Sequence, residues 1–254
     1  MTRLLEGKTV LVTGASRGIG RAIAVRLAAA GALVCAHYGT NSDAALETVR
    51  QIEAAGGRAF AIRADLARLG EIRESFATLD REISARGASG LDILVNNAGV
   101  GVMGRVADCD EATFDRLFNV NVKGMFFVTQ LAIPRLNDGG RIINISSMVS
   151  VAAYPICIVY AQTKAAVNSL TRSLAAELGP RRITVNAVAP GATATDFIGD
   201  LMKDTTMIAA LEAGAALGRI GAADDIARVV AFLASPDGGW ITGQVIQASG
   251  GMHL

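Results

Sequence analysis

Tyr160 and Lys164 have the types and the spacing needed to transfer a proton. They are four residues apart, so they share one face wherever this segment is helical. A neighbouring ammonium group stabilises a phenolate, which turns the phenol into a tuned acid. Such an acid can protonate a carbonyl oxygen near neutral pH. A Tyr–Lys pair at this spacing also fits a solvated helix face, and these two residues alone leave that alternative open.

Ser147 precedes Tyr160 by thirteen residues and follows the apolar run 141–146. This run predicts a buried strand, and residues 159–178 predict the helix that carries Tyr160. The Ser147 hydroxyl at the end of the strand can hydrogen-bond the same carbonyl oxygen as the phenol. The three side chains together are suited to polarising and protonating a carbonyl group.

A glycine-rich loop near the start of the chain has the residues needed to hold a diphosphate. It follows the β-branched run 9–13, which predicts a strand, and it leads into a predicted helix over 20–30. Gly14 can make the tight turn, Gly18 lets a pyrophosphate approach the backbone, and Gly20 lets the helix pack closely. The spacing is wider than G-x-G-x-x-G, so an ordinary strand-to-helix turn remains an alternative.

The same loop matches G-x-S-x-G, the nucleophile elbow of hydrolases, with Ser16 at its centre. His253 would then have to serve as the base. Two features disfavour a serine hydrolase. The elbow would follow the first strand, which leaves almost no sheet upstream, and His253 is the penultimate residue, where chains fray.

Short apolar runs alternate with longer amphipathic stretches along the sequence. This alternation predicts an α/β fold, a Rossmann-type doubly wound parallel sheet of about seven strands with helices on both faces. We expect one domain over residues 1–254, with a substrate-covering insertion at about 192–218. The predicted strands are 9–13, 33–38, 59–63, 91–95, 141–146, 183–188 and 244–248. The predicted helices are 20–30, 43–55, 68–86, 111–136, 159–178 and 224–234.

Composition excludes several classes of protein. The net charge is +1 and no basic run occurs, so we expect no nucleic-acid partner. No apolar run is long enough to span a bilayer, and the polar segment 1–8 is not typical of a signal peptide. The 3 cysteines lack C-x-x-C spacing, which favours reduced thiols in the cytoplasm. We find no cluster of residues spaced to ligate a metal.

These motifs together resemble the short-chain dehydrogenase/reductase family over essentially the whole chain. The pattern is most similar to 3-oxoacyl-[acyl-carrier-protein] reductases and related ketoreductases. Gln162 and Thr163 depart from the more usual Ala-Ser, and Ser249 stands where many members have Asp. The matching pieces are Thr13–Gly20, Asp65-Leu66, Asn96–Gly99, Asn121, Ser147, Tyr160 with Lys164, Pro190-Gly191 and Thr195.

The resemblance implies a role for each member of a catalytic set. Tyr160 would be the general acid or base, and Ser147 would bind and polarise the substrate oxygen. Lys164 would lower the pKa of Tyr160 and hold the nicotinamide ribose. Asn121 would hold a water that links Lys164 to a proton relay. Asn121 also fits an alternative, a helix-interior Asn bonded to a neighbouring carbonyl.

The resemblance further implies a dinucleotide site at the carboxyl ends of the strands. Three of these positions also fit structural roles without a cofactor. Asp65 fits a strand-end cap, Asn96–Gly99 fit an ordinary turn, and Pro190-Gly191 fit a loop break. The expected contacts, in addition to Tyr160 and Lys164, are Gly14, Ser16, Arg17, Gly18, Ile19, Gly20, Asp65, Leu66, Asn97, Ala98, Gly99, Pro190, Gly191, Thr193 and Thr195.

The end of the second predicted strand favours NADP, with NADPH preferred over NADH. NAD specificity normally needs a carboxylate there, whereas the strand ends on Tyr38 and no acid occurs until Asp43. Arg17 in the glycine loop can reach a 2′-phosphate, as in NADP-using relatives, and Thr40, Asn41 and Ser42 could add donors. Arg17 also fits a solvated loop residue, and Tyr38 a packing residue.

The substrate is expected to be an apolar carbonyl compound, because no arginine cluster stands out for a phosphate or carboxylate. The alternatives are an NAD(P)-dependent sugar or alcohol dehydrogenase working in the oxidative direction, and a non-catalytic dinucleotide sensor. The resemblance and the apolar C-terminal segment 240–254 favour a homotetramer. The candidate pocket residues also fit ordinary core or subunit contacts; they are Met148, Val149, Tyr154, Pro155, Ile156, Phe197, Ile198, Leu201, Met202, Met207 and Ile208.

Overall fold

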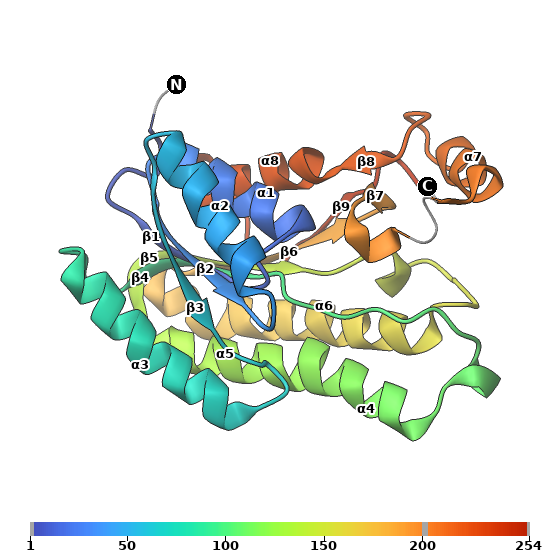
Figure 1. Cartoon of the computed structure of the whole chain (residues 1–254), viewed down its shortest axis with the longest axis horizontal. Coiled ribbons are helices and arrows are strands. Elements are labelled where there is room, and N and C mark those ends of the chain that lie inside the picture. The colour runs from blue at the N-terminus through green and yellow to red at the C-terminus, as the bar shows by residue number, and fades with distance from the viewer. Residues whose placement is uncertain (1–2, 200–202, 253–254) are drawn as a thin grey trace.

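A seven-stranded parallel sheet forms the centre of the computed structural model, which describes residues 3–199 and 203–252 (Figure 1). The strand order is β3-β2-β1-β4-β5-β6-β9. The chain winds outward from β1 in one direction and then from β4 in the other, which is the doubly wound arrangement. The strands are β1 (Thr9–Val12), β2 (Leu33–Tyr38), β3 (Arg58–Arg63), β4 (Leu91–Asn96), β5 (Leu136–Ile145), β6 (Thr184–Pro190) and β9 (Val245–Ala248).

Helices cover both faces of the sheet, as the alternating pattern predicted. Figure 1 shows α1, α2 and α8 on one face and α3, α4, α5 and α6 on the other. Their bounds are α1 (Gly18–Ala29), α2 (Ser42–Ala54), α3 (Leu69–Ala85), α4 (Glu111–Phe118), α5 (Met125–Ala132), α6 (Ile158–Leu178) and α8 (Ala223–Ala234).

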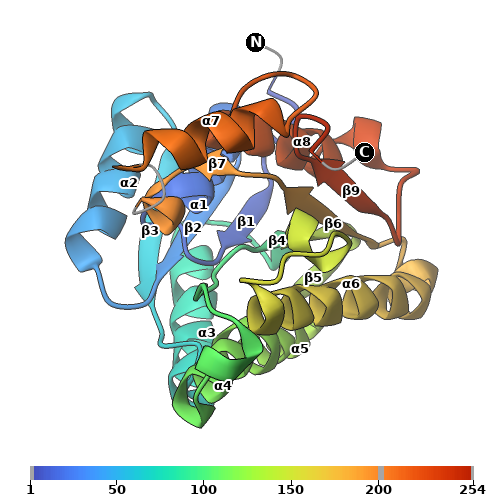
Figure 2. The same ribbon diagram turned by 90° about the vertical axis from the view of Figure 1, so that its right-hand side faces the viewer.

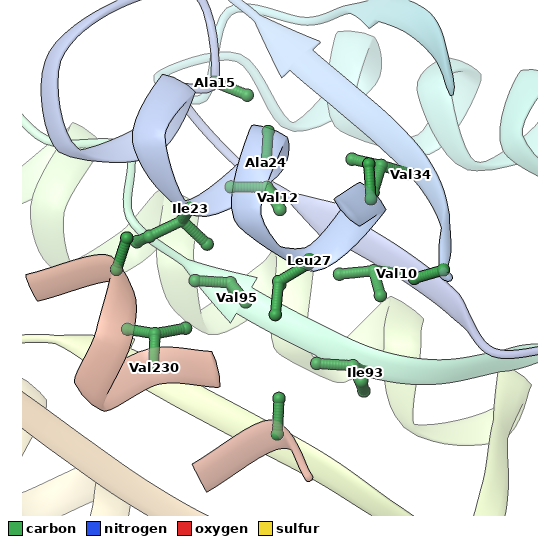
Figure 3. Close-up of a cluster of buried hydrophobic side chains, with 14 of the residues drawn as sticks. Val10, Val12, Ala15, Ile23, Ala24, Leu27, Val34, Ile93, Val95 and Val230 are labelled. Atoms are coloured by element: carbon green, nitrogen blue, oxygen red, sulfur yellow. The ribbon is translucent and has the colours of Figure 1, made fainter. Parts of the chain in front are cut away.

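The two hydrophobic cores lie between the sheet and these layers. Alternate residues of β1 point to opposite faces, so Val10 and Val12 pack under α1 while Leu11 joins the core beneath α3 and α5. Figure 3 shows the first core, where Ile23 and Leu27 of α1 meet the sheet. Since both faces are covered, the central strands are mostly apolar, which made them readable in the sequence.

Two predicted elements differ from the structure by more than a few residues. The predicted helix 111–136 is α4, a π-helical segment Asn119–Gly124, α5 and a short 3₁₀ turn. The strand predicted over 141–146 begins at Leu136, because the polar residues 137–140 continue the β5 backbone. The π-helical segment is where Asn121 lies.

The segment 192–218 lies beyond the carboxyl ends of the strands. Its start, β7 (Thr193–Ala194), pairs with β8 (Gly221–Ala222), and α7 (Thr205–Ala213) lies between them in sequence. Figures 1 and 2 show α7 set apart from the two helical layers. The candidate pocket residues Leu201 and Met202 fall outside the described residues. Across the described residues, no helix has the length and apolar character to cross a membrane.

Candidate active site

Tyr160 and Ser147 meet at the carboxyl end of β5, on the side of the molecule that Figure 2 turns toward the viewer. Tyr160 lies in the first turn of α6, and Ser147 is the second residue after the strand. Burial raises the pKa of the Tyr160 phenol well above its ordinary value, and a hydrogen bond with Ser147 opposes that rise. The phenol is therefore protonated at neutral pH and lies beside a hydroxyl, which suits a proton donor.

Lys164 is buried one helical turn after Tyr160. Its Nζ donates to the backbone oxygen of Ile145 at 2.8 Å and lies 5.6 Å from the centre of the Tyr160 ring. Burial lowers the pKa of Lys164 to about 8. The resemblance implies that Lys164 lowers the pKa of Tyr160, but here burial dominates and the net shift of the phenol is upward.

Asn121 is buried and connects the loop after β4 to helix α6. Its Oδ1 accepts from the Val100 N–H and its Nδ2 donates to the Val100 oxygen, both at 2.8 Å. Nδ2 also donates to the Thr163 hydroxyl at 3.1 Å, and that hydroxyl donates to the backbone carbonyl oxygen of Tyr160 at 2.7 Å. The carbonyl partner of Asn121 is thus on another segment of the chain and not one turn away on its own helix.

Asn168 supports the same site and was missed in the sequence. The Ser146 hydroxyl donates to Asn168 Oδ1 at 2.6 Å, and Asn168 Nδ2 donates to the Ser150 hydroxyl at 2.8 Å. The Ser150 hydroxyl then donates to the backbone carbonyl oxygen of Ser147 at 2.6 Å. This network fixes the backbone of Ser147. Its one sequence signal is the spacing of four residues from Lys164, which places Asn168 on the same face of α6.

The glycine loop has the geometry of a phosphate cradle. Gly14 and Gly18 have φ angles of +66° and +55°, which favour glycine. A Cβ on Gly20 would overlap the backbone of Gly14, so α1 begins directly against the turn. No side chain caps the N-terminus of α1, which leaves its N–H groups available to an anion.

The turn after β4 is bonded directly to this loop. The Thr13 hydroxyl accepts from the N–H groups of Asn97 and Ala98 at 2.9 and 3.0 Å. Asn97 Nδ2 donates to the oxygens of Thr13 and Gly14 at 2.9 and 3.1 Å. Gly99 continues this turn toward the catalytic set, since a Cβ on it would lie 3.6 Å from the Nζ of Lys164.

The comparisons with known proteins agree with this geometry. Residues 14–253 match a family model described as enoyl-(acyl carrier protein) reductase. An uncharacterized oxidoreductase of Methylorubrum extorquens is 45% identical over 98% of this chain and 99% of its own length. The hydroxynaphthalene reductase-like protein Arp2 of Metarhizium brunneum is 41% identical over 98% of this chain and 96% of its own.

Two solved structures show the same fold over nearly the whole chain. The angucycline C-6 ketoreductase LanV with bound NADP is 47% identical with a TM-score of 0.94, covering 99% of this chain and 98% of its own. LanV is also known with NADP and rabelomycin. A short-chain dehydrogenase/reductase from Serratia marcescens is 39% identical with a TM-score of 0.91, covering 98% of this chain and 99% of its own.

This chain belongs to the short-chain dehydrogenase/reductase family.

The residues expected to hold a dinucleotide in this short-chain dehydrogenase/reductase lie around the glycine loop, and most of them also have structural partners. Thr195 is the neighbour of Gly18, whose added Cβ would lie 3.5 Å from the Thr195 side chain. The Thr195 hydroxyl donates to the backbone oxygen of Thr193 at 3.3 Å. The Thr193 hydroxyl donates to the backbone oxygen of Gly191 at 3.0 Å. Pro190 ends β6 beside them. The uncapped helix and the open glycine backbone fit the phosphates of such a cofactor.

Three of the predicted contacts have a second role. Asn41 Oδ1 accepts from the Ala44 N–H at 2.9 Å, so this side chain caps α2. Asp65 Oδ1 accepts from the Ala67 N–H at 2.9 Å, as a strand-end cap would. Leu66 is buried in the core. Tyr38 is half-buried at the end of β2, while Thr40 and Ser42 are exposed there.

His37 was not expected to support the loop of this short-chain dehydrogenase/reductase. Its Nδ1 accepts from the Gly14 N–H at 3.3 Å, and its Nε2 lies 3.1 Å from the Ala64 oxygen. Burial lowers the pKa of His37 to about 4, so the ring is neutral at pH 7. No metal-binding group of three or more His, Cys, Asp or Glu residues occurs in the described part of the chain.

Proposed function

We propose that this protein reduces a ketone to a secondary alcohol with NADPH, and that Tyr160 is the general acid. The observation that carries this proposal is the half-buried phenol of Tyr160 in hydrogen-bond contact with Ser147. Two hydroxyls this close together can hold and polarise one carbonyl oxygen. The names of the relatives support the same reaction, because LanV is a ketoreductase with bound NADP.

The proton has a defined origin and destination. NADPH supplies the hydride to the carbonyl carbon when it is bound. The Tyr160 hydroxyl gives its proton to the carbonyl oxygen, and Ser147 holds that oxygen as its charge develops. Lys164 places a positive charge next to the phenolate that remains, which lowers the cost of the transfer. Asn121 keeps the turn after β4 and helix α6 in register through Val100 and Thr163.

NADPH is preferred over NADH in this proposal. No acid follows Tyr38 at the end of β2, and Arg17 is exposed on the glycine loop. The 2′-phosphate adds charge that an arginine binds well and that a carboxylate would repel. Consumption of NADPH and of NADH with one ketone, compared as kcat/KM, tests the preference.

The decisive experiment measures NADPH oxidation by the purified protein across β-ketoesters, aryl ketones and acyl thioesters. We expect reduction of at least one ketone, together with formation of the alcohol. Ester hydrolysis without NADPH consumption would instead indicate Ser16 chemistry. Turnover only with an alcohol and NADP⁺ would favour a sugar or alcohol dehydrogenase. Cofactor binding without any turnover would favour a sensor.

We further propose a cytoplasmic homotetramer whose segment 192–218 covers the substrate. Trp240 is 99% exposed next to the edge strand β9, and an exposed indole of this kind suits a subunit contact. The three cysteines are free, which agrees with a reducing compartment. Light scattering at micromolar concentration tests the assembly, and a monomer mass would contradict it.

A further inference from the structure

Phe197 lies against the catalytic tyrosine although it belongs to a different part of the chain. It is in the short 3₁₀ turn Asp196–Ile198, after β6 and β7. The centres of the Phe197 and Tyr160 rings are 5.7 Å apart, with 47° between the ring planes. Phe197 is nevertheless 53% exposed. Part of its ring is therefore open to solvent immediately beside the proposed proton donor.

Gly101 makes room for this ring. A Cβ on Gly101 would overlap the tip of the Phe197 ring and lie 2.9 Å from its Cε1. Any larger residue would push the ring away, so the position of Phe197 depends on the missing side chain. The aromatic ring is thus held between the loop after β4 and Tyr160.

The loops around Phe197 present apolar side chains to solvent. Val102 and Met103 follow β4, and Val151 and Ile156 follow β5; all four are exposed. The two loops are joined by a parallel bridge between Gly104 and Cys157 and by a 3.3 Å contact between the sulfurs of Met103 and Cys157. Neither residues 100–104 nor residues 148–157 include a charged side chain. These surroundings do not suit a charged substrate.

We propose that Phe197 determines substrate specificity by stacking on a flat aromatic ring fused to the ketone, while Tyr160 protonates the carbonyl oxygen. This inference rests on the proposed ketone reduction and assigns its substrate class, planar aromatic ketones, to a single side chain. Aromatic rings attract each other beyond the area that they bury, in offset or tilted arrangements. A saturated ring of the same skeleton buries similar area but loses that attraction.

Two ketones with one carbon skeleton isolate the effect. The substrates 2-tetralone and 2-decalone differ in whether the distant ring is aromatic. We measure kcat/KM for both with NADPH in wild type and in Phe197→Leu, and take the ratio of the two values. Leucine keeps an apolar side chain, so the ratio of tetralone to decalone should fall by roughly two- to twelve-fold. An unchanged ratio, or an equal loss for both ketones, overturns the proposal.

Gly101→Ala and Phe232→Leu complete the design. The alanine displaces the Phe197 ring without removing it, so the ratio should fall in the same direction. Phe232 is a similarly exposed phenylalanine on α8, and its substitution should leave the ratio unchanged. If Gly101→Ala has the same tetralone-to-decalone ratio as wild type, the position of the Phe197 ring does not affect specificity, and the proposal is also overturned. Circular dichroism verifies that each variant is folded.

A binding measurement separates this inference from the proposed function. Calorimetry of the cofactor-free protein with 2-naphthol, and with its fully saturated analogue, needs no turnover, because no hydride acceptor is present. Wild type should bind 2-naphthol more tightly than Phe197→Leu does, with little difference for the saturated alcohol. If wild type reduces neither ketone but shows this binding difference, the proposed reaction fails and the role of Phe197 stands. Equal or absent 2-naphthol binding in the two proteins overturns the role of Phe197.

Discussion

Arg17 of the glycine loop and Asp196 of the turn before Phe197 form an ion pair of 3.7 Å. Both side chains are 69% exposed, so the pair contributes little to stability. Its position matters more, since Arg17 is the residue proposed to bind the 2′-phosphate of NADPH. The carboxylate of Asp196 competes with that phosphate for the same guanidinium.

Asp196→Asn should therefore tighten NADPH binding by about two- to five-fold, the range expected for one exposed charge pair. NADH lacks the 2′-phosphate, and its affinity should change less. Calorimetric titration with both cofactors at low salt measures the difference, and Asp237→Asn, an exposed acid on the turn after α8, is the control. Weaker NADPH binding in Asp196→Asn would contradict the competition.

Tyr160→Phe should abolish most ketone reduction and leave NADPH binding intact. The substitution removes the proton donor and keeps the ring, and general acid catalysis is typically worth about a hundred- to ten-thousand-fold. The loss could be larger, because Ser147, Tyr160 and Lys164 act as one unit. Steady-state kinetics and NADPH titration are measured on the same sample. Near-full activity, or loss of NADPH binding alone, would remove Tyr160 from its role.

Asn121→Ala should lower both stability and kcat. The partly buried N–H and oxygen of Val100 lose their partner, and a polar group that is fully buried and unsatisfied costs about 1–3 kcal/mol. The turn after β4 then loses its tie to Thr163 and Tyr160, so kcat should fall further than cofactor affinity. Urea unfolding and kinetics measure the two effects, with exposed Gln162→Ala as the control. Wild-type stability would show that Val100 finds other partners.

His37 should make the protein less stable in mild acid. The folded-state pKa of about 4 lies below the ordinary value of 6.5, because burial of the ring disfavours its charged form and outweighs the opposing hydrogen bond with the Ala64 oxygen. The unfolded state therefore binds more protons between these values, and stability falls as the pH decreases from 6.5 to about 4. The full gap corresponds to about 3 kcal/mol.

The free energy of unfolding, measured by urea at pH 7.0, 5.5 and 4.5, tests this dependence. His37→Gln should be less stable at pH 7 and should lose the His37 part of the decrease in acid. An identical pH dependence in wild type and variant would mean that other groups cause the decrease. Cofactor binding at the glycine loop should also weaken in acid, because a protonated His37 ring cannot accept a hydrogen bond from the Gly14 N–H.

Much of this fold could be predicted because its central strands are buried on both faces. The runs around Val10, Val34 and Leu94 are continuous and apolar, and their boundaries agree with the structure within a residue or two. The start of β5 could not be read, because residues 137–140 are polar and glycine-rich and resemble a loop. The pairing of Leu136 with Leu91, across an irregularity in the register, and not local propensity, extends that strand.

The supporting residues of the site were harder to predict than the candidates for chemistry. Tyr160, Lys164 and Ser147 stand out by residue type and spacing. His37 and Asn168 act through partners that are distant in sequence, Gly14 and Ser146, so only the folded chain brings their roles into view. Asn41 was expected to face the cofactor, and its oxygen is used by the helix that follows.

The π-helical segment Asn119–Gly124 has a consequence for the length of the chain. A π turn equals an α-helix with one residue inserted, and one residue rotates every later side chain by about 100°. Deleting a residue here would restore a regular helix between α4 and α5. It would also turn either Asn121 away from Val100 or the apolar face of α5 away from the sheet. The position of Asn121 and the packing of the core therefore both depend on the number of residues in this segment. Insertions or deletions should be tolerated much less here than in the exposed turns.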